Sequence, residues 1–460
     1  MQAGGPVRRG RAPPRLGSVL PSRRRTTVRT PADQEPAIMP SPSPTDPLTH
    51  ERVHGLTVAE AGRVLATPAA YADEGLLHAA LALLRREAPV HYVQADGYNP
   101  FWAVTRHDDV QAVERDHTLW LNAPRPVLRS AALDAALQER RAQGKALASL
   151  VHLDEPEHRP LRAIAADWFR PKAMRALQDR VRELARRHVD LMAEHGSTCD
   201  FARQIAAPYP LYAILALLGL PESDYPLMLR LTQQLFGHDD RDKGSPAAGT
   251  PGAHMGALEE LFAYFHDLTA ARRARPTGDL ASCVAGARID GRLLDDTTIA
   301  SYYILIATAG HDTTSSTVAG GLEALIRHPD QLGLLRRDPG LLPTAVEEMI
   351  RWVSPVTSFM RTARADTHVR GVPIAAGESV LLSYPSANRD EDVFDEPFRF
   401  DVARDPNRHL AFGTGVHYCL GGRRWRGWRW RRCSPSCCPG WRASSWTASR
   451  RGRRRRSSAA

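Results

Sequence analysis

The chain has 460 residues and a formal net charge of +10. Length alone allows two or three domains, and the positive charge alone would indicate a nucleic-acid or membrane partner. Between the two arginine-rich ends only Cys199, Cys283 and Cys419 occur, which excludes a disulfide framework.

The positive charge is confined to the two ends of the chain. The first 32 residues contain eight arginines and no acid, and residues 421–460 contain thirteen arginines and no acid. Subtracting these twenty-one charges from +10 leaves a net charge of −11 for residues 33–420. Because the body of the chain is acidic, we expect no nucleic-acid partner.

Residues 1–47 are expected to be a disordered, basic extension, since ten of the 35 prolines precede Leu48. This extension lacks the apolar region of a secretory signal, and Met39 is a candidate for the true start of the protein. The longest apolar run, residues 211–220, is too short to span a bilayer. These features predict a cytoplasmic protein without a membrane span.

Helical periodicity dominates the body of the chain, with apolar stripes over residues 76–84 and 177–191. Short strands are predicted at the following positions: 90–93, 101–105, 355–362 and 379–384. The sequence therefore predicts a mainly α fold, formed by a single large helical domain with a small β region over residues 48–421.

A long apolar helix is predicted over residues 301–319, where Asp295 can cap the helix and place negative charge at its positive end. Ala309 and Gly310 lie near its middle. A mid-helix glycine costs about 1 kcal/mol relative to alanine, so Gly310 calls for a structural or functional reason.

Asp312 and Thr313 follow directly, and an acid beside an alcohol is what a proton relay requires. Such a pair in an apolar wall is costly unless it is hydrogen-bonded. Alternatively, Thr313 and Thr314 bond back to helix carbonyls and have no further role. His311 is interpreted as helix surface or groove lining.

Glu348 and Arg351 lie three residues apart, so their side chains can meet on one helical face. Taken alone, this spacing is common among solvated ion pairs.

The most informative segment is the loop around Cys419, with Phe412, Gly413 and His417 at fixed positions before it. Its glycines allow the backbone to fold tightly over a flat cofactor. Loop amides can then point at the sulfur and tune a metal bound to the thiolate.

The pattern F-G-x-G-x-H-x-C-x-G resembles the haem-binding loop of the cytochrome P450 family of haem-thiolate monooxygenases. The likeness covers about residues 67–421. It implies the fold of that family, haem b as cofactor and Cys419 as the ligand of the haem iron. It also implies that the helix opens at Ala309 and Gly310 into a groove for dioxygen.

The same resemblance assigns partners to the haem carboxylates. The segment around His158 and Arg162 resembles the family's H-x-x-x-R element, and Arg361 and His417 match the other propionate partners. Buried carboxylates need such cations.

The position of Glu348 and Arg351, about seventy residues before the cysteine loop, resembles the buried Glu-Arg pair of the family. There a third basic residue completes the network. Arg399 is the candidate for that residue, with Arg404 as the alternative.

The implied activity is insertion of one oxygen atom from O2 into an apolar small molecule. Electrons would come from a separate ferredoxin-type or flavin donor, and Asp312 with Thr313 would deliver protons. A peroxide-driven enzyme or a haem sensor would not need that pair. The implied protein is a monomer.

Four segments before the cysteine loop resemble those of bacterial enzymes that oxidise sterol side chains, branched lipids or terpenoids. They are residues 352–356, 359–363, 386–391 and 407–410. The substrate pocket is expected to be formed by residues 120–145 and 236–254, which carry no recognisable specificity motif.

Residues 422–460 depart from the family, which continues here into an Ala/Leu-rich helix. The chain instead has an Arg/Trp-rich tail in which no helical stripe survives. A reading-frame slip in a GC-rich gene predicts such a composition and would leave an impaired haem protein. A nucleic-acid-binding tail and a metal cluster at Cys433, Cys437 and Cys438 are the alternatives.

Overall fold

The computed structural model describes residues 55–144, 147–168, 171–196, 198–236 and 251–422. The predicted extension 1–47, the candidate start Met39 and all but the first residue of the tail 422–460 lie outside these ranges.

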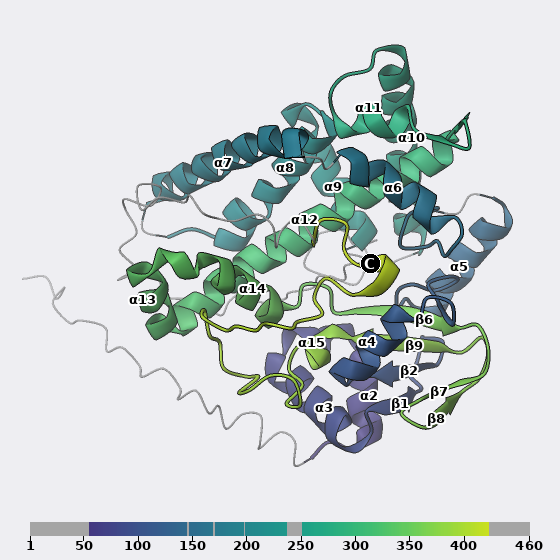
Figure 1. The fold of residues 1–460 in the computed structure, drawn as a ribbon, viewed down its shortest axis with the longest axis vertical. Coiled ribbons are helices and arrows are strands. Elements are labelled where there is room, and N and C mark those ends of the chain that lie inside the picture. Colours follow the sequence, from purple (N-terminus) through teal and green to yellow (C-terminus); the bar gives the residue numbers. More distant parts are fainter. Residues whose placement is uncertain (1–54, 145–146, 169–170, 197, 237–250, 423–460) are drawn as a thin grey trace, which may run out of the picture. The chain divides into compact units, whose positions relative to one another are not determined.

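Helices make up most of the described chain and follow the predicted periodicity (Figure 1). In chain order the α-helices are α2 (Val58–Leu65), α3 (Glu74–Glu87), α4 (His107–Arg115), α5 (Ala131–Ala142), α6 (His158–Trp168), α7 (Pro171–Glu194), α8 (Pro208–Leu218), α9 (Tyr225–Phe236), α10 (Pro251–Ala274), α11 (Leu280–Ala285), α12 (Asp296–Arg327), α13 (Pro329–Arg337), α14 (Leu342–Val353) and α15 (Tyr384–Ala387).

Shorter helical segments connect several of them. Turns of 3-10 helix occupy Pro68–Ala72, Glu222–Asp224, Pro339–Leu341 and Gly415–His417, and Phe201–Ala206 is a π-helical segment.

The principal sheet has five strands in the order β1-β2-β9-β6-β3. Its strands are β1 (Val90–Val93), β2 (Phe101–Val104), β3 (Trp120–Leu121), β6 (Ser358–Ala363) and β9 (Ser379–Ser383). Two small antiparallel pairs are formed by β4 (Arg288–Ile289) with β5 (Arg292–Leu293) and by β7 (Thr367–Val369) with β8 (Val372–Ile374). Only β2 and β9 pair in parallel within the principal sheet.

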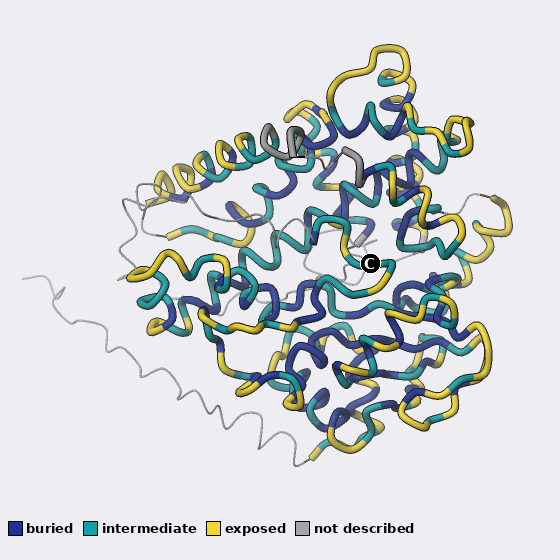
Figure 2. The backbone as a smooth tube through the Cα atoms, in the orientation of Figure 1, coloured by how far each residue is buried: buried dark blue, intermediate teal, exposed yellow. Residues whose placement is uncertain are grey.

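Two of the four hydrophobic clusters among the described residues surround the elements that position the site. One cluster packs α2 and α3 against the sheet, where it includes Phe101, Met360 and Leu381. All residues of strand β9 are buried, as the tube coloured by burial shows (Figure 2). The other surrounds the first half of α12, including Tyr303 and Ile304, and receives side chains from α8 to α11. The helix α12 is therefore the central element of the helical region (Figure 1).

The predicted start of the central helix is confirmed. The Asp295 carboxylate accepts a hydrogen bond from the backbone N–H of Thr298, 2.8 Å away, and satisfies one of the unpaired donors at the helix end. The helix extends beyond the predicted range 301–319 and is continuous through the Ala309–Thr313 segment.

The other elements show where periodicity succeeds and fails. Strand β1 has the predicted bounds, and β6 begins at Ser358 instead of Pro355, after Ser354 ends α14 with a left-handed φ of 43°. In α7 the predicted stripe continues through Leu184 and His188, which are buried, but Leu191 is exposed.

One stretch, Phe201–Leu218, is long and apolar enough to cross a membrane, and 39% of it is buried in the structure. Within it, Leu211, Leu215 and Leu218 of α8 pack into the cluster around α12. Core helices of proteins without membrane spans also have this length and composition.

Candidate active site

The cysteine loop is held against α4 by close backbone contact. The backbone N–H of Cys419 donates to the Phe412 carbonyl at 2.9 Å, which closes the loop. Gly415 has a left-handed φ of 68°, and a Cβ on it would lie 2.4 Å from the Glu114 carbonyl oxygen. Glycine at this position therefore does more than leave room for a flat cofactor. It also allows the backbone of the cysteine loop and the backbone of α4 to approach each other closely.

The Cys419 side chain has an exposed surface, yet it lies among enough protein atoms for desolvation to act on it. This desolvation raises the pKa of the thiol, whereas hydrogen bonds from the backbone amides of Gly421 and Gly422 and the charge of Arg162 act in the opposite direction. The predicted amides therefore do point at the sulfur. An accessible sulfur with such donors suits a thiolate bound to a metal.

Four predicted cationic residues converge beside this loop. His158 and His417 lie with ring centroids 4.2 Å apart, and Arg162 donates to the Tyr418 carbonyl at 2.5 Å. Arg361, on β6, is 2% exposed and donates to the Met360 carbonyl. Residues far apart in the sequence are thus brought together around the cysteine loop.

This cluster has the electrostatic character of an anion site. Burial, together with the charges of Arg361, His158 and Arg162 and a smaller effect from His117, lowers the pKa of His417 to about 2. His158 is buried, and neither of its ring nitrogens has a hydrogen-bond partner among the described residues, although the Glu155 carboxylate lies 3.7 Å from its Nδ1. Two carboxylates placed here would receive the donors and cations that they need, so these residues fit a haem.

Two residues near this cluster were missed by the sequence analysis. They are His117, whose charge acts on His417, and Glu114 of α4. The Glu114 side chain is 2% exposed and accepts a hydrogen bond from the Tyr384 hydroxyl at 2.5 Å. Burial raises the pKa of Glu114, while Arg361, 3.4 Å away, and Tyr384 oppose that shift. The sequence could have indicated the burial of Glu114, because it lies one helical turn after the apolar Val110, on the same face of α4.

The helix α12 lies near the cysteine loop, since Leu420 packs against the hydrophobic cluster that surrounds this helix. The Thr313 hydroxyl donates to the Ala309 carbonyl at 2.7 Å, which is the alternative considered above for this threonine. Its oxygen retains the capacity to accept a hydrogen bond. Ala309 is exposed although it lies in mid-helix, and the Asp312 carboxyl is 19% exposed.

The interpretation of His311 as helix surface or groove lining was wrong. Its side chain is 1% exposed, and Nε2 lies 3.0 Å from the Ala207 carbonyl oxygen. Gly310 has a packing reason as well, since a Cβ there would lie 2.5 Å from Cδ1 of Ile214. Both contacts arise because α8 and the turn before it pack closely against α12.

The Glu348–Arg351 pair is fully buried, as the resemblance implied. Arg351 donates to the two carboxylate oxygens through Nε and Nη2, at 2.7 and 2.8 Å. The third basic residue is Arg404, whose Nε lies 3.2 Å from Glu348, and not Arg399. The Arg399 side chain is half exposed and pairs with Glu396. Its backbone carbonyl, and not its guanidinium, takes part in the network, since it accepts a hydrogen bond from Arg351 at 3.3 Å.

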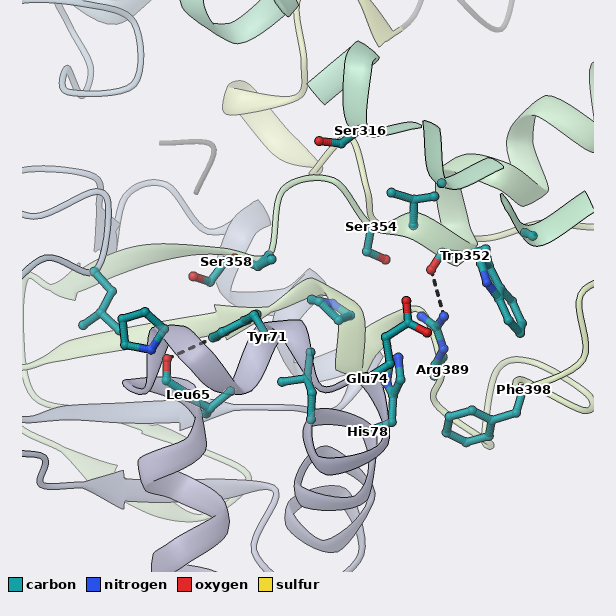
Figure 3. A pocket seen from close by; sticks show the side chains of 18 of the residues that line it. Leu65, Tyr71, Glu74, His78, Ser316, Trp352, Ser354, Ser358, Arg389 and Phe398 are labelled. Carbon is teal, nitrogen blue, oxygen red and sulfur yellow. Dashed lines mark hydrogen bonds between the residues drawn. The ribbon is translucent and has the colours of Figure 1, made fainter. Parts of the chain in front are cut away.

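Two cavities flank the central helix. One, of about 210 Å³, lies between α3, the end of α14 and the second half of α12, and contains Glu74, His78 and Arg389 (Figure 3). The other, of about 280 Å³, lies against the first half of α12 and is lined by residues between Pro124 and Leu153. The predicted pocket segment 120–145 therefore does line a cavity. Of the segment 236–254, only His254 is found there, and residues 237–250 lie outside the described ranges.

Comparison with known proteins is consistent with this geometry. Residues 339–423 match the family model described as Cytochrome P450. The cytochrome P450-terp of Pseudomonas sp is 41% identical over 367 residues, which cover 78% of this chain and 86% of that protein. The methyl-branched lipid omega-hydroxylase of Mycobacterium tuberculosis is 35% identical over 359 residues, covering 76% and 81%.

The fold agrees in the same way. The crystal structure of CYP108D1 from Novosphingobium aromaticivorans matches with a TM-score of 0.72 and 41% identity, covering 80% of this chain and 88% of that one. With its mainly helical architecture, its cysteine loop and relatives of this identity over most of their length, the chain belongs to the cytochrome P450 family of monooxygenases, whose cofactor is haem b.

Proposed function

We propose that this cytochrome P450 hydroxylates an apolar small molecule of the lipid, sterol or terpenoid class. The observation that carries the proposal is the Cys419 loop beside a buried cationic cluster. The apolar wall of the larger cavity and the names of the two curated relatives support the substrate class. Electrons come from a separate ferredoxin-type or flavin donor, and the protein acts as a cytoplasmic monomer.

The cofactor is held by residues from four parts of the chain. The Cys419 thiolate would be the iron ligand, and the amides of Gly421 and Gly422 would disperse its charge. When bound, haem supplies the activation of dioxygen and the transfer of one oxygen atom to the substrate.

The two arginines would neutralise the haem carboxylates, and the two histidines, whose pKa values are lowered, would donate hydrogen bonds to them. His158 and Arg162 lie one helical turn apart on α6, so both can reach one carboxylate. Arg361 and His417 approach from β6 and from the 3-10 turn before Cys419. Their burial strengthens each contact because the local dielectric constant is low.

Proton delivery is assigned to Asp312 and Thr313. The Asp312 carboxyl retains access to solvent and can exchange protons with it. The Thr313 hydroxyl, which donates to the Ala309 carbonyl, can accept a proton and release its own by rotation. Phe412 and Gly413 shape the loop that carries Cys419, since the Phe412 carbonyl accepts the hydrogen bond that closes it and Gly413 has a left-handed φ of 65°.

The decisive experiment is the spectrum of the reduced, CO-bound protein. A thiolate-ligated haem is expected for the wild type, and Cys419→Ser is expected to lose that spectrum together with oxygen activation. Retention of the spectrum in the variant would place the ligand elsewhere. Screening sterols, branched fatty acids and monoterpenes for a Soret shift to shorter wavelength tests the substrate class, which is wrong if only small polar ligands produce the shift.

A further inference from the structure

The larger cavity contains a buried positive charge that the proposed haem site does not use. Arg129 is 9% exposed and lines this cavity with Asp134, which is 6% exposed, and with His152. Much of the remaining wall is apolar, with Ile304 and Leu305 contributed by α12. A guanidinium in such a wall needs an anionic or hydrogen-bonding partner.

The described residues do not supply that partner. No hydrogen bond or ion pair within 4.0 Å joins Arg129 to any of them, and its electrostatic neighbour is Asp134. The Asp134 carboxylate is engaged elsewhere, since it accepts a hydrogen bond from Asn99 at 3.1 Å and lies 3.7 Å from Nη1 of Arg125. Asp134 therefore offsets part of the charge of Arg129 without contacting it.

The charge of Arg129 acts on another residue that lines the cavity, His152. Burial lowers the pKa of His152 to about 3, and the positive charge of Arg129 contributes to that shift. His152 is consequently neutral at physiological pH and bonds to the Ser149 hydroxyl at 2.9 Å. Neither residue provides a negative charge for the guanidinium.

This site is distinct from the cationic cluster beside Cys419. The residues that line the cavity include Arg129 and His152 but none of His158, Arg162, Arg361 and His417. The cavity instead reaches α12 at Thr308, one residue before Ala309. A molecule that fills it would extend from Arg129 toward the part of α12 that faces the proposed haem site.

We propose that Arg129 binds the carboxylate of the substrate, so that the substrate is an apolar carboxylic acid held with its hydrocarbon end toward α12. The planar guanidinium can donate two parallel hydrogen bonds to a carboxylate. The leucine and isoleucine side chains of the wall accommodate the hydrocarbon. Oxidation then falls at the end of the molecule remote from the carboxylate. This inference rests on the proposed function for the assignment of the cavity as the substrate pocket.

The test compares ligands that differ only in the head group. Binding of 3,7-dimethyloctanoic acid and of its methyl ester to the haem-loaded, full-length protein is measured by calorimetry at pH 7. The wild type is expected to favour the acid by about tenfold or more, as for a charge-assisted hydrogen bond. Arg129→Met is expected to bind both ligands equally, and Arg129→Gln, which keeps a polar side chain, must show the same loss.

The matched control is Arg141→Met, which removes the same charge from an exposed position at the edge of the cavity. It is expected to keep the preference for the acid. Equal binding of acid and ester by the wild type, an unchanged preference in Arg129→Met, or an equal loss in Arg141→Met would each overturn the proposal. Because the binding ratio does not depend on turnover, a protein that lacks monooxygenase activity would still report on Arg129.

Discussion

Removal of Arg351 should be among the most destabilising single changes in the described chain. The guanidinium makes two hydrogen bonds to Glu348 and one each to the carbonyls of Asn388 and Pro397, at 2.9 Å, and both members of the ion pair are 0% exposed. Arg351→Met leaves a buried carboxylate and three backbone carbonyls, those of Asn388, Pro397 and Arg399, without this partner. Breaking a buried pair on one side costs about 3–5 kcal/mol, a large share of the usual 5–15 kcal/mol of a domain.

The comparison with two other arginines makes this reasoning testable. Arg404→Met removes a second, more distant cation from Glu348 and should cost less than Arg351→Met. Arg399→Met removes only an exposed pair with Glu396 and should change the stability little. The free energies of unfolding are measured by urea denaturation, with the denaturant slope checked for each variant. An Arg399→Met variant as unstable as Arg351→Met, or an Arg404→Met variant like the wild type, would refute the assignment of the network.

Two further predictions concern protons. Burial alone would raise the pKa of Glu348, but hydrogen bonding and charge from Arg351, with Asp401 and Arg404, lower it below its ordinary value of about 4.5. The stabilisation that this carboxylate provides is therefore complete above pH 4.5 and is lost as the pH falls through the folded value, so acid unfolding curves of Glu348→Gln should be flatter there than those of the wild type. Thr313→Ala should keep haem and oxygen binding but divert reducing equivalents to peroxide; an unchanged yield of product per electron would make Thr313 a purely structural hydroxyl.

The sequence predicted those features well that depend only on residues close to one another in the chain. Strand β1, the Asp295 cap and the closed loop before Cys419 all depend on nearby residues, and the structure confirms them. The pairing of Glu348 with Arg351 also follows from helical spacing.

Tertiary packing decided the remaining features. The choice between Arg399 and Arg404 depends on the path of a loop, and spacing does not reveal it. His311 lies on a helix that is covered on several sides, so its burial by α8 has no counterpart in the apolar pattern. Glu114 and Arg129 are buried charges, which an analysis based on hydrophobic periodicity assigns to the surface.

The sequence after Gly421 leads to the last prediction, that the chain as written binds haem weakly. The family match ends at residue 423, and residues 421–460 contain thirteen arginines and no acid. Like charges at this density repel one another and cannot be buried without partners. An Ala/Leu-rich helix in this position would bury some hundreds of Å², worth several kcal/mol at roughly 25 cal/mol/Å². We therefore expect sequencing of the gene across the codons for Leu420 to Arg424 to reveal a frame that restores such a helix, and the corrected protein to release haem to apomyoglobin more slowly than the present chain. A gene that reads cleanly in the present frame, together with tight haem retention by the full-length protein, would contradict the frame slip and favour a functional tail.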